Sequence, residues 1–146
     1  MCSILEMFFF KITVCFFFIH FGMLFSSEIL IKVQNLPNDM GAIHVAIYDK
    51  AENFPKKNGK FLGLKKNVNE VFYDGIIVKN LEAGKYAIAI YHDQNNNNKF
   101  DRFLGLPSEK YGFSNDAKIF FGPPNFEEAS FDLLEKELKK IFIKLR

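Results

Sequence analysis

Short segments in which apolar and polar residues alternate recur along this chain, and they constrain its fold more than any other feature. In residues 42–49, Ile43, Val45 and Ile47 fall on one face, and residues 28–34 show the same alternation. A period of two is the pattern of a β-strand with one buried face. The chain is therefore predicted to form short strands joined by turns.

Two further segments show the pattern of a β-strand, and one segment between them and residues 42–49 does not. Residues 70–80 are rich in β-branched and aromatic side chains, and residues 85–93 alternate most cleanly. Residues 50–68 are basic and interrupted by proline and glycine, which predicts mostly loop. The sequences HVAIYD (44–49) and IAIYHD (88–93) resemble each other, and we expect two equivalent strands that end at the same edge of a sheet.

The strand pattern fixes an expected fold class. Strands at short spacing, turns rich in Gly, Pro and Asn, and the lack of a long helical pattern predict an all-β protein. We expect one antiparallel β-sandwich over residues 27–146, an Ig-like or transthyretin-like Greek key of about seven strands. A small β-barrel is the other architecture that these strands could build.

The tail, residues 125–146, supports two interpretations. Residues 126–129 are predicted to form a short turn, followed by a hairpin with Lys136 and Glu137 near its tip and a final strand in 141–145. The alternative is a helix, because one helical stripe could be formed by Leu133, Leu134, Leu138, Ile141 and Leu145.

The first 26 residues are predicted to be a signal peptide and not part of the fold. Lys11 precedes an apolar stretch from Ile12 to Phe25, and the small residues Ser26 and Ser27 follow it. The alternative is an uncleaved anchor, although a spanning helix wants roughly 20 apolar residues. Either way residues 27–146 are expected to be exported, periplasmic or extracellular, with membrane contact only through this segment.

Composition excludes several classes of function. Both cysteines, Cys2 and Cys15, lie in the predicted signal segment, so the remaining chain has neither disulfides nor a cysteine nucleophile. The formal net charge is only +2, with both signs spread along the chain. This balance argues against nucleic acid as a partner.

A short motif before residues 85–93 predicts a local contact. Leu81, Gly84 and Tyr86 form an L-x-x-G-x-Y pattern at the entry to a strand. At such corners of Greek-key sandwiches a tyrosine hydroxyl bonds back to the backbone upstream. The alternative is a glycine turn that happens to precede a tyrosine.

The stretch DQNNNNKFD, residues 93–101, has the spacing of a calcium-binding loop. The candidate ligands are at the first, third, fifth, seventh and ninth positions: Asp93, Asn95, Asn97, Lys99 through its carbonyl, and Asp101. Oxygens at these positions suit Ca²⁺. The sixth position must turn with positive φ, which Asn98 tolerates.

Two features weaken this candidate site. Leu104 stands at the twelfth position, where a bidentate glutamate is usual, and only Glu109 further on could close the shell. With few charged ligands the expected affinity is weak, with Kd about 10⁻⁴ to 10⁻³ M. The alternative is a solvated, purely structural asparagine loop without an ion.

Residues 104–115 form a second candidate functional loop. It is long, contains two glycines and a proline, and offers Glu109, Tyr111 and Asn115. Long ordered loops are often functional, so we expect it to pack beside the acidic loop and form a binding edge. The alternative is that Tyr111 and Phe113 only pin the loop to the sandwich.

No catalytic constellation is expected. His92 and Ser114 could be imagined as parts of a hydrolase triad, but Ser114 lacks the flanking glycines of a nucleophile elbow. His92 is interpreted as the end of a strand that bonds the loop it introduces. The chain is therefore predicted not to be an enzyme.

Residues 84–133, with HVAIYD and NFP upstream, resemble the bacterial domain-of-unknown-function 2141 family. The resemblance implies an exported, β-rich protein without an established activity. It places the acidic loop of that family on His92, Asp93, Asn95, Asn97, Lys99 and Asp101. It places a second block on Gly105, Pro107, Glu109, Tyr111, Gly112, Phe113, Ser114 and Asn115. Asn98 departs from the glycine usual in the family.

These observations lead to one functional expectation and one alternative. We expect an exported, non-catalytic binding module of the cell envelope, with an unknown envelope or extracellular partner and a weak calcium-type loop at Asp93–Asp101. The alternative is a structural or adaptor β-sandwich without a bound ion, which interacts through its loops or a sheet edge.

Overall fold

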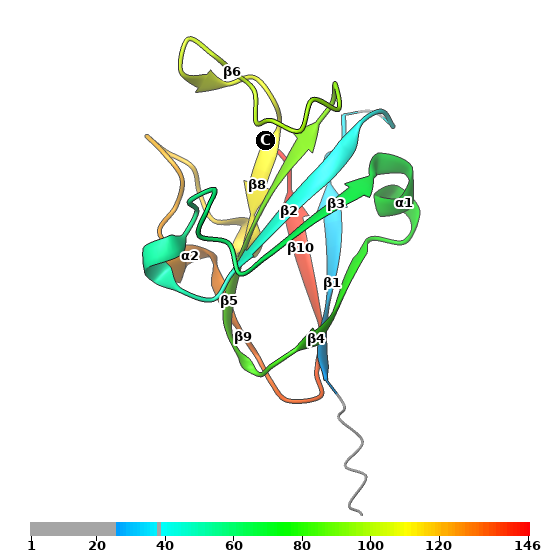
Figure 1. Cartoon of the computed structure of the whole chain (residues 1–146), viewed down its shortest axis with the longest axis vertical. Coiled ribbons are helices and arrows are strands. Elements are labelled where there is room, and N and C mark those ends of the chain that lie inside the picture. The colour runs from blue at the N-terminus through cyan, green and yellow to red at the C-terminus, as the bar shows by residue number, and fades with distance from the viewer. Residues whose placement is uncertain (1–25, 38) are drawn as a thin grey trace, which may run out of the picture.

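Two β-sheets packed face to face form the body of the protein (Figure 1). The structure is a computed structural model that describes residues 26–37 and 39–146. The first sheet has the strand order β10–β1–β4, and the second has the order β3–β2–β5–β8, with β9 also paired to β5. The fold is thus the predicted β-sandwich.

The chain forms ten strands and four short helices in the part that the structure describes. The strands are β1 (Ser27–Gln34), β2 (Ala42–Tyr48), β3 (Leu62–Asn67), β4 (Ile76–Leu81), β5 (Gly84–Asp93), β6 (Arg102–Phe103), β7 (Leu106–Pro107), β8 (Tyr111–Phe113), β9 (Ser130–Leu133) and β10 (Leu138–Lys144). The helices are η1 (Ala51–Asn53), α1 (Val68–Tyr73), η2 (Ser114–Asp116) and α2 (Phe126–Ala129). The pair β6–β7 is a separate small sheet.

The main core lies between the two sheets and has the predicted alternation. Ile43, Val45 and Ile47 of β2 are buried against Ile29 and Ile31 of β1 in one apolar cluster. Burial of such side chains is the main favourable term in folding, about 1.5–3 kcal/mol for each. The alternating segments of the sequence therefore determine which face of each strand is covered.

A second, smaller core covers part of the outer face of the larger sheet. Phe54 contacts Tyr48, Phe113 and Phe126 edge-on, with ring centroids 5.2–6.0 Å apart. Tyr48 and Phe113 belong to β2 and β8 of the sheet. The segment after β2 supplies Phe54 and α2 supplies Phe126, and both segments lie on the same side of the sheet (Figure 1). This packing holds the loops that follow β2 and β8 in place.

Residues 50–80 differ from the sequence-based expectation. The predicted loop contains strand β3, and the segment expected to be a strand begins with helix α1. The side chain of Asn67 caps this helix by accepting a hydrogen bond from Asn69 N, and Val68 and Val71 bury one side of it. Spacing of three between two valines in so short a stretch is too weak a signal to predict a helix.

The expectation of two equivalent strands ending at one edge is wrong. β2 and β5 are antiparallel neighbours in which Ala42 pairs with Asp93 and Tyr48 pairs with Ala87. Their ends therefore lie at opposite edges of the sheet. The similarity of their sequences reflects the shared demand for a core-facing alternation and not a shared position.

Residues 126–129 form the one-turn helix α2 where a turn was predicted, and the predicted final strand is present as β10, so the tail is not the helix of the alternative interpretation. The hairpin is wrong, because β9 pairs with β5 while β10 pairs in parallel with β1 in the other sheet. A tight turn joins them, in which Leu134 N donates to the Glu137 carboxylate at 2.7 Å. The turn therefore carries the chain from one sheet to the other.

The tyrosine corner is confirmed. Tyr86 is buried among core residues, and its hydroxyl donates to the carbonyl oxygen of Glu82 at 3.1 Å. This hydrogen bond gives the buried hydroxyl a partner four residues upstream and fixes the backbone at the entry to β5.

The predicted signal peptide, residues 1–26, lies outside the described residues except for Ser26. In the part of the chain that the structure describes, no helix has the length and apolar character needed to cross a membrane.

Candidate functional site

Asp93, the last residue of β5, organises the loop that follows it. Its carboxylate is fully buried. One oxygen, Oδ2, accepts hydrogen bonds from His44 Nε2 at 3.0 Å and Asn98 N at 2.9 Å, and Oδ1 accepts one from Asn97 N at 3.0 Å. The start of the loop is thus bonded to a buried negative charge.

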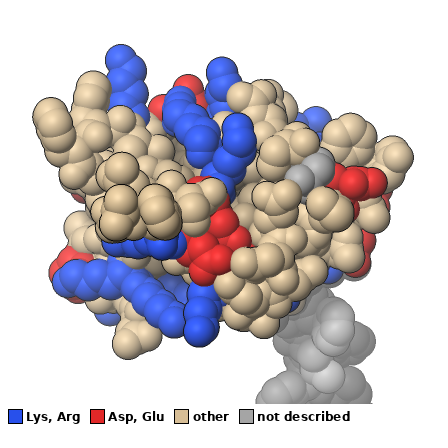
Figure 2. Space-filling model, turned by 90° about the horizontal axis from the view of Figure 1, so that it is seen from above, with Lys and Arg blue, Asp and Glu red and all other residues tan. Residues whose placement is uncertain are grey.

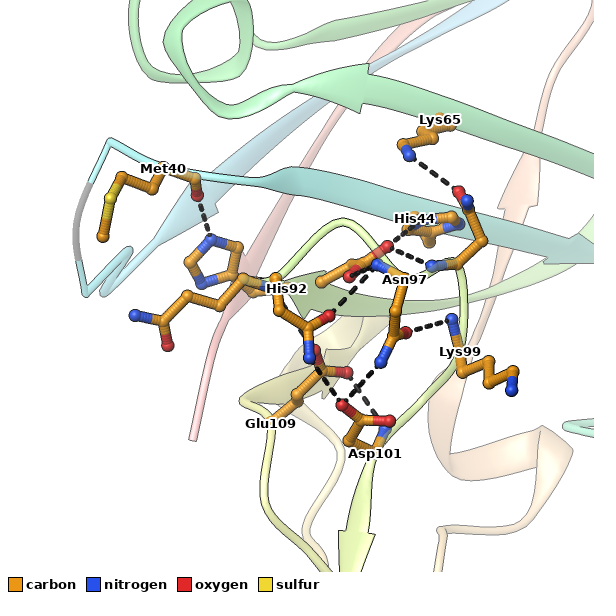
Figure 3. A network of polar contacts seen from close by, with 12 residues as sticks. Met40, His44, Lys65, His92, Asn97, Lys99, Asp101 and Glu109 are labelled. Atoms are coloured by element: carbon orange, nitrogen blue, oxygen red, sulfur yellow. Dashed lines mark hydrogen bonds and ion pairs between the residues drawn. The ribbon is translucent and has the colours of Figure 1, made fainter.

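Asp101 closes the other end of the same loop. Its Oδ2 accepts hydrogen bonds from Asn95 Nδ2 at 2.9 Å and Asn97 Nδ2 at 2.8 Å. Asn97 therefore connects the two carboxylates, with its backbone N–H on Asp93 and its side-chain amide on Asp101 (Figure 3). Asp93, Asn95, Asn97 and Asp101 are thus joined in one hydrogen-bond network. Lys99 takes part through its backbone N–H, which donates to Asn97 Oδ1 at 2.7 Å, and not through the predicted carbonyl.

The asparagines supply the backbone conformation that this loop requires. Asn98 has φ 61°, as predicted for the sixth position, and Asn96 has φ 57°. Asparagine is enriched in this left-handed region because its short polar side chain bonds locally. The amide of Asn98 also accepts a hydrogen bond from Lys65 of β3 at 2.7 Å, which ties the loop to the sheet.

Glu109 joins the second loop to the first. Its carboxylate accepts hydrogen bonds from Gln94 N at 3.2 Å and Asp101 N at 3.1 Å. The prediction that residues 104–115 pack beside the acidic loop is therefore confirmed. Glu109 reaches the start and the end of the acidic loop through backbone donors and not through a shared ion.

The other predicted residues of the second loop lie in different places. Tyr111 is half-buried between Phe100 and Phe113, with centroids 5.3 and 6.0 Å away. Asn115 bonds Ser130 O at the start of β9 instead of pointing to Glu109. Glu109 and Tyr111 thus belong to the loop end, whereas Asn115 stabilises the region around α2.

The loop has oxygens for a cation, but its present hydrogen bonds turn amide N–H groups toward Asp101. Within the described ranges no three His, Cys, Asp or Glu side chains are grouped so that they could hold a metal ion. A calcium ion beside Asp101 would need Asn95 and Asn97 to turn their carbonyl oxygens toward it. Leu104, at the twelfth position, is 87% exposed and provides no ligand.

The electrostatics favour an ionised Asp93 beside a neutral His44. Burial acts to raise the pKa of Asp93, but hydrogen bonds from Asn98 N, His44 and Asn97 N hold it below its ordinary value. Burial lowers the pKa of His44, although contact with Asp93 opposes this. Burial and the nearby charges, that of Asp93 first, raise the pKa of Tyr91 to about 12.

His44 is the site residue that the sequence did not reveal. It lies on β2 opposite Tyr91 of β5, and the two rings stack with centroids 4.6 Å apart. Its only sequence signal is its place on the outward face of an alternating strand. Its contact with Asp93 depends on the register between β2 and β5, which no local pattern specifies.

His92 and Ser114 serve separate structural contacts. His92 Nε2 donates to Met40 O at 2.6 Å, so it bonds the loop before β2 and not, as expected, the loop that it introduces. Ser114 is buried; its hydroxyl donates to Ala129 O and accepts from Ile88 N at 2.8 Å. These hydrogen bonds hold β5, η2 and α2 together.

The surface of this end carries mixed charge. Figure 2 looks down on the end of the molecule that is uppermost in Figure 1 and shows acidic side chains near the centre with Lys and Arg around them. The net field is therefore neither strongly acidic nor strongly basic, in agreement with the composition.

Comparison with known proteins agrees with the resemblance seen in the sequence. A family model described as "Uncharacterized protein conserved in bacteria (DUF2141)" matches residues 31–141. No curated protein and no solved structure matched the chain. The matched range begins within β1, ends within β10 and contains both candidate loops. The chain therefore belongs to the DUF2141 family of bacterial proteins.

Proposed function

We propose that this chain is an exported, non-catalytic binding module of the cell envelope, with the end formed by residues 93–115 as its binding end. The observation that carries the proposal is the link made by Glu109 between the two loops. This link turns two separate loops into one defined polar surface on a rigid sheet. Long ordered loops held by a scaffold are the usual place for recognition.

Two sequence and structural features support the non-catalytic and exported parts of the proposal. His92 and Ser114, the side chains considered for hydrolysis, bond different backbone carbonyls, Met40 O and Ala129 O. The apolar stretch from Ile12 to Phe25 has the composition of a secretory signal.

The hydrogen bonds favour an ion-free loop as the ground state of this module. Asp93 has three donors, and two amides already bond Asp101. A structural or adaptor role without an ion needs no rearrangement of these contacts. Weak calcium binding is the second candidate, and its support is that Asn97 bonds both Asp93 and Asp101, so that one loop holds the two carboxylates.

A calcium titration followed by thermal melting separates the two states. The sample is the chain from Ser26 on, which contains both sheets and the core described above. A site with Kd about 10⁻³ M gains about 1.8 kcal/mol at about 20 mM calcium, which raises Tm by about 5 °C. An unchanged Tm in this range identifies the ion-free adaptor.

A designed positive control shows that the measurement can detect an ion in this loop. Asn95→Asp with Asn97→Asp gives the loop four carboxylates at the ligand positions, which repel one another without an ion. This variant is expected to melt lower than the parent in EDTA and to regain stability with calcium. Asp132→Asn, on the exposed side of β9, changes a carboxylate away from the loop and should leave the calcium response of the parent unchanged.

A further inference from the structure

Three strongly exposed apolar side chains lie within the proposed binding end. Phe103, Leu104 and Leu106 are 72%, 87% and 71% exposed. They form the tip of the β6–β7 hairpin, where Phe103 pairs with Leu106. Buried or scattered apolar residues are ordinary, but a contiguous exposed group marks an interaction site.

The hairpin projects from the body and is held in shape at its base. β6 and β7 pair with each other and not with a strand of either main sheet, and they stand clear of the sheets in Figure 1. Ser108 N donates to Asp101 O at 3.0 Å, which closes the base next to the acidic loop. Leu104 and Gly105 both have positive φ, which makes the turn at the tip tight.

A second exposed apolar pair lies on another segment. Phe120 and Phe121 are 78% and 110% exposed in the segment between η2 and α2. The β6–β7 tip offers only a few such side chains, against about 20–30 residues a side in a standard protein interface, whereas a small apolar tip can enter a lipid interface.

The charges around the hairpin complement an anionic surface. Lys99, Arg102 and Lys110 flank it, and the described part of the chain contains no ion pair for any of them. The neighbouring carboxylates of Asp101 and Glu109 are half-buried and accept hydrogen bonds from the acidic loop. Three basic side chains with no ion pair among the described residues therefore stand beside the apolar tip, as in segments that bind anionic lipids.

We propose that the β6–β7 tip docks this domain onto an anionic phospholipid bilayer, with Phe103, Leu104 and Leu106 inserted at the headgroup boundary and the three basic side chains on the lipid phosphates. Interfacial segments bury apolar side chains about 5–10 Å deep in this way. The proposal deepens the binding role proposed above and rests on it, by naming the partner. It adds a membrane contact that the sequence predicted only for residues 1–26.

Tryptophan fluorescence tests the insertion, since the chain contains no tryptophan. Leu104→Trp in the chain from Ser26 on is titrated with vesicles of equal parts phosphatidylcholine and phosphatidylglycerol, in EDTA. We expect a blue shift of its emission. Phe142→Trp, on the outer face of β10 and 56% exposed in the parent, is the matched control and should not shift.

Co-sedimentation with the same vesicles tests the residues. The variant with Phe103, Leu104 and Leu106 changed to Ser should lose about tenfold or more in partition coefficient. Changing Lys99, Arg102 and Lys110 to Gln should weaken binding to these vesicles and leave the small binding to pure phosphatidylcholine unchanged. All these positions are at the surface, so the variants should melt like the parent.

Three results would overturn the proposal. In the first, the parent sediments no more with vesicles than without them. In the second, the emission of tryptophan at positions 104 and 142 shifts to the blue equally. In the third, sedimentation velocity shows a dimer that depends on the tip while vesicles are not bound, which would assign the tip to a second copy. The thermal melting experiments with calcium contain no vesicles, and the vesicle experiments contain EDTA. A negative result in one therefore does not affect the interpretation of the other.

Discussion

At the scale of single residues, Asp93 is the most constrained polar group of the candidate site. It is fully buried and accepts hydrogen bonds from His44, Asn97 N and Asn98 N. A buried carboxylate is tolerated only when its charge is compensated in this way. Asp93 therefore stabilises the fold whether or not the loop ever takes up an ion.

Asp93→Asn is expected to destabilise the domain by about 3 kcal/mol, because the amide nitrogen would face donors and the charge-assisted hydrogen bonds would be lost. Asp101→Asn changes the same loop at a partly exposed position and should cost less than about 1 kcal/mol. Urea unfolding of the chain from Ser26 on measures both. Equal losses would show that burial of Asp93 is not what makes it important.

Tyr86→Phe removes the corner hydrogen bond and leaves the ring in the core. We expect a loss of about 1 kcal/mol in the free energy of unfolding. Tyr73→Phe, at a position 77% exposed, is the matched control and should be neutral. A neutral Tyr86→Phe would contradict the stabilising role of the hydroxyl contact with Glu82.

Residues whose role is local could be predicted from the sequence, and residues whose role depends on register could not. Tyr86 and Asn98 each act within a few residues of their own position, through a corner contact and a positive φ. His44 meets Asp93 only because β2 and β5 pair with Ala42 opposite Asp93. A slip of one residue would turn His44 to the other face of the sheet.

At the scale of elements, the strands with a clean alternation were predictable and the elements at the edge of the sheet were not. β3 is paired only with β2 and is mostly exposed, so lysines are tolerated in it and its sequence resembles a loop. Lysine on an edge strand also discourages pairing with other chains. The same feature that protects the edge thus hides the strand from a pattern-based prediction.

β8, within the second loop, packs against the C-terminal end of β10, and Gly112 allows the two strands to approach closely. A Cβ at Gly112 would lie 2.5 Å from Lys144 O and 2.9 Å from Ile143 Cγ2. On either side, Tyr111 and Arg146 exchange backbone hydrogen bonds at 3.2 and 3.0 Å. The contact therefore closes the sandwich between the last residues and the strand that follows Glu109.

Gly112→Ala is expected to cost about 2–3 kcal/mol, because backbone at this close approach cannot yield as a side chain could. Gly122→Ala, where a Cβ would meet nothing within 4 Å, is the matched control and should be neutral. Thermal melting measures both variants. A neutral Gly112→Ala would contradict the close packing of β8 on β10.

At the scale of the whole molecule, the family and the sandwich were predictable, but the arrangement of the strands was not. Family resemblance and alternation identify two apolar faces, and burying one on the other is the common solution for such strands. The parallel pairing of β10 with β1 joins the two ends of the described chain. Residues so far apart in sequence carry no local signal of their pairing.

As the pH is lowered, the free energy of unfolding should decrease in two stages, the first governed by His44 and the second by Asp93. The folded pKa of His44 is lowered from 6.5, so the unfolded chain binds a proton first, and stability falls as pH drops below 6.5. The folded pKa of Asp93 is lowered from 3.8, so its contribution is complete above 3.8 and is lost as pH falls through the folded value. Both effects have the same sign, and both make the domain weaker in acid.

Urea unfolding between pH 7 and pH 3 in the parent, His44→Gln and Asp93→Asn tests this assignment. His44→Gln should flatten the first stage, because glutamine does not titrate, and should keep most of the second, because Asn98 N and Asn97 N still donate to Asp93. Asp93→Asn should remove the second stage and enlarge the first, because it removes the carboxylate that opposes the lowering of the His44 pKa by burial. An unchanged first stage in His44→Gln would show that other groups govern it and that the His44–Asp93 contact does not link the stability of the sandwich to pH.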